Sequence, residues 1–327
     1  MTVHLEDINQ AADRLRGIAI ETPIHTSAVL NERVNAEIFI KPECLQHVGA
    51  FKFRGAYNRL CQMSDAERAK GAVAFSSGNH AQGIAYAAKL LGMNATIVMP
   101  SDAPSIKKEG TERLGARIRL YDRATESREE IAADIAASSG ATLVPAFDDV
   151  DVIAGQGTCG LEIMQQLAVK NCIPDAVLSP CGGGGLLAGL STAVKEINSA
   201  TRVYGVEPEN YDDHSISKAA GERTQIEPQH TTSCDALMAT QPGEITWSIN
   251  SKTVDDFLVV SEDEVAHAIS FAFRYLKLVI EPGGAVALAA LLHNKVDISG
   301  GTAAIVLSGG NIDSGTFFSC LQNYPSP

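Results

Sequence analysis

The 327-residue sequence lacks the features that mark nucleic-acid-binding or membrane proteins. Its 26 Lys and Arg residues are outnumbered by 39 Asp and Glu residues, so the net charge is −13 and extensive binding to nucleic-acid phosphates is not expected. No apolar run approaches the roughly 18 residues that a membrane span needs. The acidic start, MTVHLEDINQ, differs from a signal peptide. We therefore expect neither a nucleic-acid nor a membrane partner.

Cysteine pairs at metal-binding spacing are also absent. The seven cysteines are scattered, odd in number and contain no C-x-x-C pair. This usage is typical of reduced thiols in a cytosolic protein, and the spacing gives no zinc motif. Internal repeats and low-complexity segments are missing too. We expect a soluble, acidic, cytoplasmic protein that is long enough for two domains.

Strand-like and helical segments alternate along most of the chain, which predicts parallel α/β sheets. Two series of such segments meet near residue 148. Serines followed three residues later by glutamate predict helix starts at Ser64, Ser127 and Ser261, and the last of these helices is expected to reach about Leu278. The predicted strands are 71–75, 95–100, 116–122, 175–180, 202–209 and the first part of 301–313.

A run of four glycines, residues 182–185, lies between the predicted strand 175–180 and a helical segment. Glycines let backbone N–H groups approach an anion closely, at a helix N-terminus whose dipole favours negative charge. A tight turn alone needs one or two glycines, so the run favours a phosphate site. The segment also fits a relaxed dinucleotide motif, Gly183-x-Gly185-x-x-Ala188, with Glu207 ending a strand about 20 residues later. Nicotinamide binding is therefore an alternative.

Lys52 lies between two phenylalanines in the segment GAFKFRGA. Burial disfavours the cation and lowers a lysine's pKa, and the neutral amine is the form that attacks a carbonyl carbon. A surface lysine whose stem is covered by aromatic rings would explain the same pattern. The glycine run favours the first interpretation, because a phosphorylated aldehyde such as pyridoxal phosphate needs both an amine and an anion site. A nicotinamide cofactor needs only the anion site.

Two further polar segments follow predicted strands. In SSGNH, residues 76–80, Asn79 can hydrogen-bond a phenolic oxygen, and the serines and N–H groups at a helix start can hold a carboxylate. In LSGGN, residues 307–311, Ser308 places a hydroxyl at the carboxyl end of a strand, where ligands of α/β proteins bind. Taken alone, an ordinary helix cap and a plain turn would explain these two segments equally well.

Together these segments resemble the fold-type II pyridoxal phosphate enzymes, and within them the serine/threonine dehydratase and serine racemase family. The resemblance runs from about Ile8 to Asn311 and is carried by segments in the family's order: FKFRGAYN, SSGNHAQGIAYAAKLLG, VIAGQGT, CGGGGLLAG, GVEPEN, IEPGGAVALAAL and LSGGN. It implies two open, twisted, mostly parallel sheets flanked by helices, as in the β subunit of tryptophan synthase. The cofactor would lie in the cleft between a large domain, 1–70 and 149–327, and a small domain, 71–148. Periodicity alone does not show this insertion.

The resemblance also implies roles for the polar residues. Lys52 would bond covalently to the cofactor and later accept the substrate α-proton. Ser308 would face the pyridine nitrogen without protonating it, which favours rapid β-elimination. The other implied cofactor contacts are Phe51, Asn79, Gly182, Gly183, Gly184, Gly185, Leu186 and Glu281. The implied contacts of the substrate α-carboxylate are Ser76, Ser77 and His80.

Two residues point from threonine dehydratases toward the racemase branch of the family. Ser77 stands where biosynthetic threonine dehydratases usually have alanine, and in serine racemases this serine is a second catalytic base; a hydroxyl that only hydrogen-bonds is the alternative. Arg128 resembles the racemase branch's second substrate-carboxylate contact, with a solvated arginine at a helix start as the alternative. A bidentate pair between Arg128 and a β-carboxylate would select a dicarboxylate. The chain departs from that branch at DALMATQ, where racemases are rich in serine.

We therefore expect a pyridoxal phosphate-dependent dehydratase, an ammonia-lyase, that converts 3-hydroxyaspartate through iminosuccinate to oxaloacetate and ammonia. Alternatives within the family are an L-threonine or L-serine dehydratase and a serine or aspartate racemase. Outside it, a nicotinamide-dependent dehydrogenase and a non-catalytic amino-acid-binding module are alternatives.

A metal and a second subunit are further expectations from the resemblance. Glu207, Asp213 and the carbonyl of Tyr211 match the family's site for Mg²⁺, Mn²⁺ or Ca²⁺, although acidic loop residues are usually only solvated. We expect a homodimer whose only other partner is a small amino acid substrate.

Overall fold

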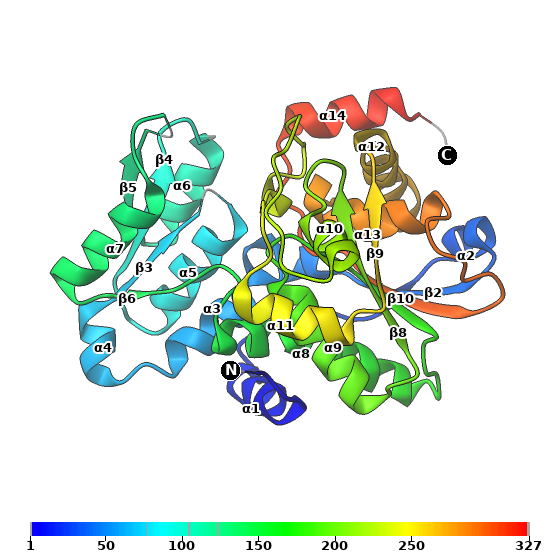
Figure 1. The fold of residues 1–327 in the computed structure, drawn as a ribbon, viewed down its shortest axis with the longest axis horizontal. Helices are drawn as coiled ribbons and strands as arrows, with labels where there is room; N and C mark the ends of the chain where they lie inside the picture. Colours follow the sequence, from blue (N-terminus) through cyan, green and yellow to red (C-terminus); the bar gives the residue numbers. More distant parts are fainter. Residues whose placement is uncertain (1, 77, 104, 123, 326–327) are drawn as a thin grey trace.

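The computed structural model describes residues 2–76, 78–103, 105–122 and 124–325, without the side chains of 105–107. The described strands form two separate sheets, one of six strands and one of four. In Figure 1 the four-stranded sheet and its helices lie on the left, and the six-stranded sheet lies on the right. The expected α/β fold with two mostly parallel sheets flanked by helices is confirmed.

The six-stranded sheet has the order β1-β2-β10-β7-β8-β9. Only β1 runs antiparallel to its neighbour within this described sheet. Its strands are β1 (His25–Thr26), β2 (Glu37–Lys41), β7 (Ala176–Pro180), β8 (Arg202–Pro208), β9 (Asp256–Val260) and β10 (Thr302–Val306). The register pairs Pro180 with Val206. Cys181, the residue after β7, therefore lies beside Glu207 of β8.

The four-stranded sheet has the order β5-β4-β3-β6, and its neighbouring strands are all parallel. Its strands are β3 (Ala72–Phe75), β4 (Ala95–Pro100), β5 (Arg117–Tyr121) and β6 (Thr142–Leu143). Strands of the six-stranded sheet come from both sides of this segment in the sequence. The domain boundaries at 70/71 and 148/149 stay predictions.

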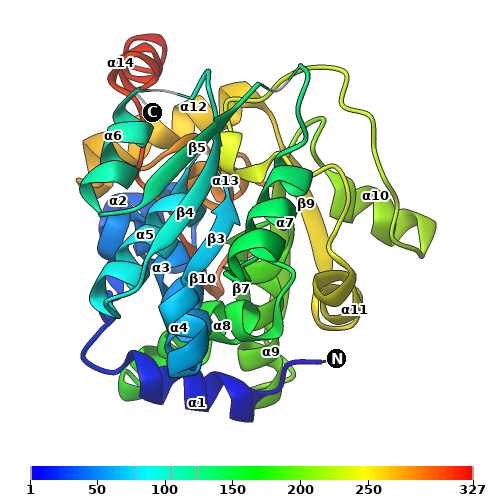
Figure 2. The same ribbon diagram turned by 90° about the vertical axis from the view of Figure 1, so that its left-hand side faces the viewer.

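Helices cover both sheets, as Figures 1 and 2 show from two sides. The described α-helices are α1 (Leu5–Leu15), α2 (Ala28–Val34), α3 (Lys52–Cys61), α4 (Asp65–Lys70), α5 (Asn79–Leu90), α6 (Ser105–Arg113), α7 (Arg128–Ser139), α8 (Val150–Val169), α9 (Gly185–Ile197), α10 (Asp213–Ala220), α11 (Glu244–Thr253), α12 (Glu262–Phe271), α13 (Pro282–Leu292) and α14 (Ser314–Asn323). Short 3₁₀ turns are η1 (Glu43–Leu45), η2 (His47–Gly49) and η3 (Asp235–Leu237), and η4 (Ala272–Leu276) is a π-helix.

The predicted helix starts are confirmed at the three serines. Ser64 and Ser261 form capping boxes with Glu67 and Glu264, and the Ser127 hydroxyl accepts a hydrogen bond from the N–H of Glu130. The expected helix to Leu278 differs: α12 ends at Phe271 and continues as η4, after which Lys277 takes a left-handed conformation with φ 60°. No Gly or Pro marks this change in the sequence.

Helix α13 forms part of the core beneath the six-stranded sheet. Every residue from Pro282 to Leu292 is buried, and its small apolar side chains belong to a cluster that also contains residues of β2, β7, β8 and β10. A helix that is apolar on all sides needs such a fully buried position. The carboxyl ends of the strands are thereby held on a rigid support.

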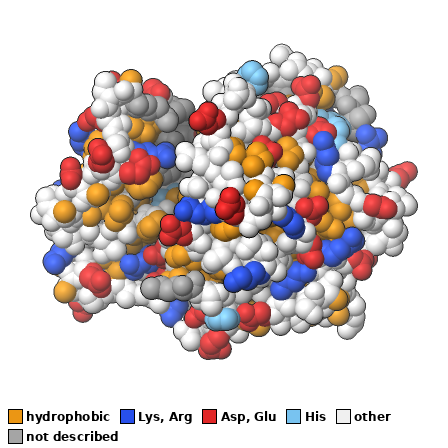
Figure 3. All heavy atoms as spheres, in the orientation of Figure 1, with side chains coloured by type: hydrophobic (Ala, Val, Ile, Leu, Met, Phe, Trp, Pro, Cys, Tyr) orange, Lys and Arg blue, Asp and Glu red, His pale blue; other side chains and the backbone are white. Residues whose placement is uncertain are grey.

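The surface is mixed in charge. On the face drawn in Figure 3, basic and acidic side chains are interspersed, with no broad basic stripe. Among the described residues, no helix is both long enough and apolar enough to cross a bilayer.

Candidate active site

Lys52 is the first residue of α3, and its neighbours tie it to the segment after β10. The N–H of Phe51 donates a 3.1 Å hydrogen bond to the carbonyl of Ser308, and Ala50 and Gly309 form an isolated antiparallel bridge. Two segments about 250 positions apart, FKFRGA and LSGGN, are therefore side by side. The backbone next to Lys52 therefore lies beside the backbone of Ser308, which agrees with the resemblance.

Close helix packing fixes the position of α3. An ideal Cβ on Gly155 would lie 2.6 Å from the Cα of Gly55, so α3 and α8 touch backbone to backbone at this point. Any larger side chain at Gly55 or Gly155 would push the two helices apart. The start of α3, and with it Lys52, is held against a long buried helix.

A buried network of charges anchors the same helix. The guanidinium of Arg54 donates to both oxygens of Glu43 at 2.8 Å and to Glu162 at 2.6 and 2.8 Å. Lys41 donates to Glu162 at 2.6 Å and to the carbonyl of Thr22. Two cations thus face two carboxylates, and this mutual pairing is what allows four charges to lie in the interior.

The amine of Lys52 is shielded from water. Its Nζ donates a 2.7 Å hydrogen bond to the carbonyl of Ala146 and lies 5.1 Å from the centre of the Phe51 ring. Burial lowers the pKa of Lys52 to about 8, because the cation loses its hydration. Phe53 points elsewhere and packs against His47 and Tyr86 in the core of the four-stranded part. Phe51 alone of the two flanking rings borders the amine.

His80 is a neutral side chain at the start of α5. Burial and the nearby Lys52 charge lower the pKa of His80 to about 3. Its Nε2 therefore carries the proton and donates to the carbonyl of Val144 at 3.0 Å. The buried Nδ1 has no hydrogen-bond partner among the described residues, and in this tautomer it can only accept. The ring is thus unsuited to donate to a carboxylate.

Asn79 joins the α5 start to the segment after β10. Its Nδ2 donates to a carboxylate oxygen of Glu281, and its Oδ1 accepts a 2.7 Å hydrogen bond from Asn311. Gly309 lies so close to Glu281 that a Cβ there would overlap the carboxylate. Asn79, Glu281 and Ser308 are brought together, with Ser308 only 4% exposed.

The glycine run forms an open anion site at the start of α9. In the described chain no hydrogen bond leads from the N–H groups of its five residues, Gly182, Gly183, Gly184, Gly185 and Leu186. Free N–H groups at a helix N-terminus are suited to a phosphate.

Each of the four glycines also has a packing reason to lack a side chain. A Cβ on Gly182 or Gly184 would lie 3.0 Å from Leu237 or 2.6 Å from His214, and Gly183 and Gly185 both press on Phe147. The run of four is therefore explained by packing as well as by anion binding.

Arg128 lies near the end of β3. Its guanidinium stacks 5.4 Å from the centre of the Phe75 ring, and Phe75 is the last residue of β3, directly before Ser76. Its Nε donates to Glu129 at 2.7 Å, and the side chain is half exposed. The Ser76 hydroxyl accepts from the N–H of Gly78 at 3.1 Å. Ser77 lies outside the described residues.

The predicted metal residues lie in a buried cluster of polar groups. Some members of this cluster were not predicted from the sequence. Glu207 is the second-last residue of β8, and its two oxygens accept from the N–H groups of His214 and Ser215 at 2.9 Å. Burial, with a smaller contribution from the charge of Asp213, raises the pKa of Glu207 to about 7. Tyr211 is buried in the loop before α10.

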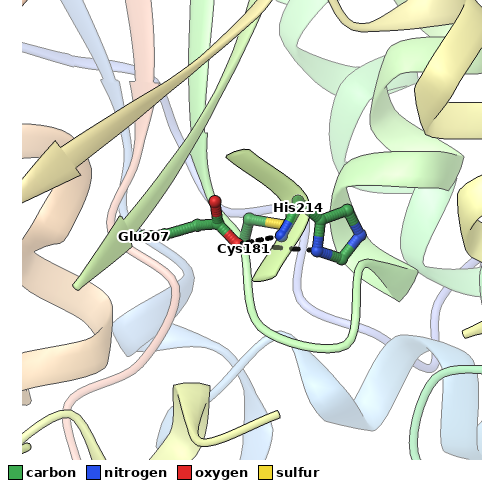
Figure 4. Close-up of side chains that lie close together, drawn as sticks. All are labelled: Cys181, Glu207 and His214. Atoms are coloured by element: carbon green, nitrogen blue, oxygen red, sulfur yellow. Dashed lines mark hydrogen bonds and ion pairs between the residues drawn. The ribbon is translucent and has the colours of Figure 1, made fainter. Parts of the chain in front are cut away.

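Cys181 and His214 were not expected at this place. Figure 4 shows both side chains directed toward Glu207. The spacing between cysteines contains no signal for them. The adjacency of β7 and β8 does, because Cys181 directly follows β7 and Glu207 lies near the end of β8. That adjacency requires the strand order, which no local pattern provides.

Comparison with known proteins identifies the family. Residues 15–309 match the family model described as pyridoxal-phosphate dependent enzyme. The chain belongs to this family. Lys52, the glycine run, Asn79, Glu281 and Ser308 all lie within the matched residues.

Individual relatives cover nearly the whole chain. An L-threo-3-hydroxyaspartate ammonia-lyase of Saccharomyces cerevisiae is 42% identical over 94% of this chain and 93% of the relative. An L-threonine ammonia-lyase of Thermotoga maritima is 44% identical over 95% of this chain and 76% of the relative. The solved structure of maize serine racemase is 35% identical, with a TM-score of 0.92 over 99% of this chain and 98% of that one.

The family excludes the nicotinamide alternative. Glu207, the acid that a dinucleotide motif would direct to a ribose, instead accepts two backbone hydrogen bonds from α10. The groups present fit pyridoxal phosphate: an amine of lowered pKa, five N–H groups that donate to none of the described residues, and polar side chains around Asn79 share one region. The chain is a pyridoxal phosphate enzyme.

Proposed function

We propose that the protein is an ammonia-lyase that eliminates water from 3-hydroxyaspartate. Identity to relatives does not select this substrate, because the two relatives named for different substrates are 42% and 44% identical. The position of Arg128 carries the proposal. Its cation stacks on Phe75, which directly precedes Ser76 and the start of α5, and so offers a second carboxylate contact.

The reaction breaks two bonds of the substrate. The α-proton and the β-hydroxyl leave as water, the resulting enamine becomes iminosuccinate, and hydrolysis gives oxaloacetate and ammonia. Bound pyridoxal phosphate withdraws electrons from the α-carbon, which is the chemistry that makes this proton removable. Proton transfer and the binding of cofactor and substrate would be carried out by groups of the protein.

Lys52 would act as the base that takes the α-proton. A lysine amine must be neutral to accept a proton, and the lowered pKa of about 8 makes this form accessible near neutral pH. The N–H groups of residues 182–186 would hold the cofactor phosphate. Asn79 would bind its ring oxygen, Ser308 would face its ring nitrogen, Glu281 would orient Asn79, and Phe51 would border the ring.

The N-terminus of α5 would bind the α-carboxylate. The N–H groups of the first turn of a helix have no partner within the helix and favour anions. Ser76 borders this turn, and we keep Ser77 as a proposed contact and second base. His80 would contribute its backbone N–H rather than its ring, because the ring is neutral and its free nitrogen only accepts.

A divalent cation near Glu207, Tyr211 and Asp213 and a homodimeric state complete the proposal. Glu207 and Asp213 are both fully buried carboxylates, and carboxylate oxygens are ligands that Mg²⁺ and Ca²⁺ prefer. Light scattering tests the dimer, whose mass would be twice the 34.6 kDa of the chain.

A substrate panel tests the activity. Ammonia release would be measured with threo- and erythro-3-hydroxyaspartate, serine and threonine, each as both enantiomers, together with the chirality of the remaining substrate. The proposal expects one 3-hydroxyaspartate isomer to have the highest kcat/KM. A clear preference for threonine or serine contradicts it, and loss of chirality without ammonia would identify a racemase instead.

A further inference from the structure

The peptide groups of the glycine run are bonded through their carbonyls and not through their N–H groups. The carbonyl of Gly183 accepts a 2.8 Å hydrogen bond from the hydroxyl of Thr246. The carbonyl of Gly184 accepts from the N–H of Ala188 at 2.8 Å and from Nδ2 of Asn250 at 3.3 Å. The N–H groups of the run donate to none of the described residues. These peptides are therefore held from their carbonyl side.

A fixed carbonyl also fixes the N–H group on the other side of the same peptide. The peptide unit is planar, and in its trans form the C=O of one residue and the N–H of the next point in opposite directions. Because Thr246 binds the carbonyl of Gly183 from α11, the N–H of Gly184 points away from α11. The accepted hydrogen bond also polarises this N–H and strengthens the bond that it can donate. Thr246 therefore orients one of the five N–H groups proposed to hold the phosphate.

Thr246 is itself held in place at the start of α11. The N–H groups of Glu244, Ile245 and Thr246 donate to the carboxylate of Asp148 at 3.0, 2.9 and 3.2 Å. Gly243 leaves room for this contact, because a Cβ there would lie 2.4 Å from Oδ1 of Asp148 and 2.8 Å from Oγ1 of Thr246. The side chain of Thr246 is fully buried, so bulk water does not compete for its hydroxyl.

The hydrogen bond of Thr246 joins two elements that are far apart in the sequence. A threonine within a helix ordinarily donates to a carbonyl one turn earlier in the same helix. Thr192 of α9 does so, with a 2.8 Å hydrogen bond to the carbonyl of Ala188. Thr246 instead donates to Gly183, 63 positions away, across the contact between α11 and α9 (Figure 1). Its hydroxyl therefore fixes the glycine run rather than its own helix.

We propose that Thr246 is a positioning residue for binding of the cofactor phosphate. Its hydroxyl holds the peptide between Gly183 and Gly184, so that the N–H of Gly184 is directed to the phosphate. The hydroxyl touches no reacting atom and acts through this peptide alone. The inference rests on the proposed phosphate role of residues 182–186, and it adds a residue from outside the glycine run to that site.

Ligands with and without a phosphate group test the proposal. The full-length protein, freed of cofactor, would be titrated with pyridoxal phosphate and with pyridoxal. Thr246→Val removes the hydroxyl and keeps the shape of the side chain. It should weaken binding of pyridoxal phosphate by roughly 3- to 10-fold, as expected for one lost hydrogen bond, and leave the affinity for pyridoxal unchanged. An equal loss of affinity for both ligands, or no loss for either, overturns the proposal.

Matched variants isolate the hydroxyl. Thr192→Val removes the hydroxyl of another buried threonine that bonds a carbonyl, and it should keep the affinity for both ligands. Thr246→Ser keeps the hydroxyl and should bind pyridoxal phosphate as the unsubstituted protein does. If Thr246→Val does not fold, Thr246→Ser and Thr246→Ala are compared, since only the serine variant can donate to Gly183. Equal affinity of these two variants for pyridoxal phosphate overturns the proposal.

Inorganic phosphate separates this inference from the proposed role of the glycine run. Its dissociation constant would be measured by competition with pyridoxal phosphate, and a higher value in Thr246→Val supports both. The same value in both proteins overturns the role of Thr246 and leaves the phosphate site standing. Equal affinity of the unsubstituted protein for pyridoxal and pyridoxal phosphate overturns both. None of these measurements uses a substrate, so they do not depend on the choice between 3-hydroxyaspartate, serine and threonine.

Discussion

At the scale of single residues, Lys52 shows how burial sets reactivity. Its pKa of about 8 means that the amine becomes neutral as pH rises through this value. Only the neutral amine can bond to the cofactor aldehyde. We therefore predict that pyridoxal phosphate binds covalently to the apoenzyme more slowly at low pH, by roughly tenfold for each pH unit below about 8.

Stopped-flow absorbance over a range of pH measures this rate, and reduction with borohydride followed by peptide mapping should find the cofactor on Lys52. Because the pKa of His80 lies near 3, no second inflection from that ring is expected near pH 6.5. A midpoint near 10.5, the ordinary value for lysine, would contradict the role of burial.

We propose that substrate choice depends on Arg128. Arg128→Ala should lower kcat/KM for 3-hydroxyaspartate by roughly 10- to 100-fold, the usual cost of a lost hydrogen bond to a charged group. Turnover of serine, which has no β-carboxylate, should change little. Arg117→Ala is the matched control, since Arg117 is an exposed arginine at the opposite end of the four-stranded sheet. Equal losses on both substrates would refute a β-carboxylate contact.

At the scale of elements, the turn into α9 depends on Gly184. Its φ is 91°, and a Cβ there would lie 2.6 Å from Nε2 of His214. Gly184→Ala should weaken cofactor binding and lower stability by more than the roughly 1–2 kcal/mol that a left-handed alanine costs. Gly221→Ala is the control, because Gly221 has φ 76° and open space around it.

Fluorescence titration with pyridoxal phosphate and thermal unfolding would measure both effects. The control variant should lose only the conformational part and keep its cofactor affinity. Equal behaviour of the two variants would show that contact with His214 is unimportant.

The buried charge network makes α3 sensitive to Arg54. Arg54→Met leaves Glu43 and Glu162 with Lys41 alone, and removal of one member of a buried ion pair costs about 3–5 kcal/mol. Arg16→Ala, which breaks an exposed pair with Asp13, should cost at most about 1 kcal/mol. Urea unfolding of the two apoproteins would compare them. A loss below 1 kcal/mol for Arg54→Met would contradict the importance of the network.

Local sequence patterns predicted helices and strands better than they predicted the tertiary contacts between them. The capping boxes at Ser64 and Ser261 could be predicted because donor and acceptor are three residues apart. The change from α12 to a π-helix at Ala272 could not, since FAFRYL carries no helix-breaking residue. The stacking of Arg128 on Phe75 and the meeting of Cys181 with His214 depend on tertiary packing, which residue spacing does not encode.

At the scale of the whole molecule, residues 144–148 join the two sheets. Val144 and Ala146 accept hydrogen bonds from His80 and Lys52, and Phe147 packs on the glycine run. Asp148 then caps α11 from a distance by accepting from the N–H groups of Glu244 and Ile245. One short segment thus touches Lys52, His80 and the glycine run.

Asp148→Ala should therefore do more than remove a cap. We predict a stability loss of about 0.5–2 kcal/mol, as for other caps, together with weaker binding of pyridoxal phosphate because Phe147 is no longer held. Asp313→Ala removes the cap of α14 and should cost similar stability without affecting the cofactor. Thermal unfolding and cofactor titration separate the two effects. An unchanged cofactor affinity in Asp148→Ala would argue against coupling through this segment.

Phe147 also constrains the order in which this sequence can change over generations. Its ring fills the space where a side chain at position 183 would lie, and its backbone borders position 185. A lineage that gains alanine at 183 first must pass through a protein with overlapping atoms. One that first loses the ring at 147 removes the three nearest of these contacts. The two substitutions are therefore easier in one order than in the other. A smaller residue at position 147 has to come before a side chain at position 183.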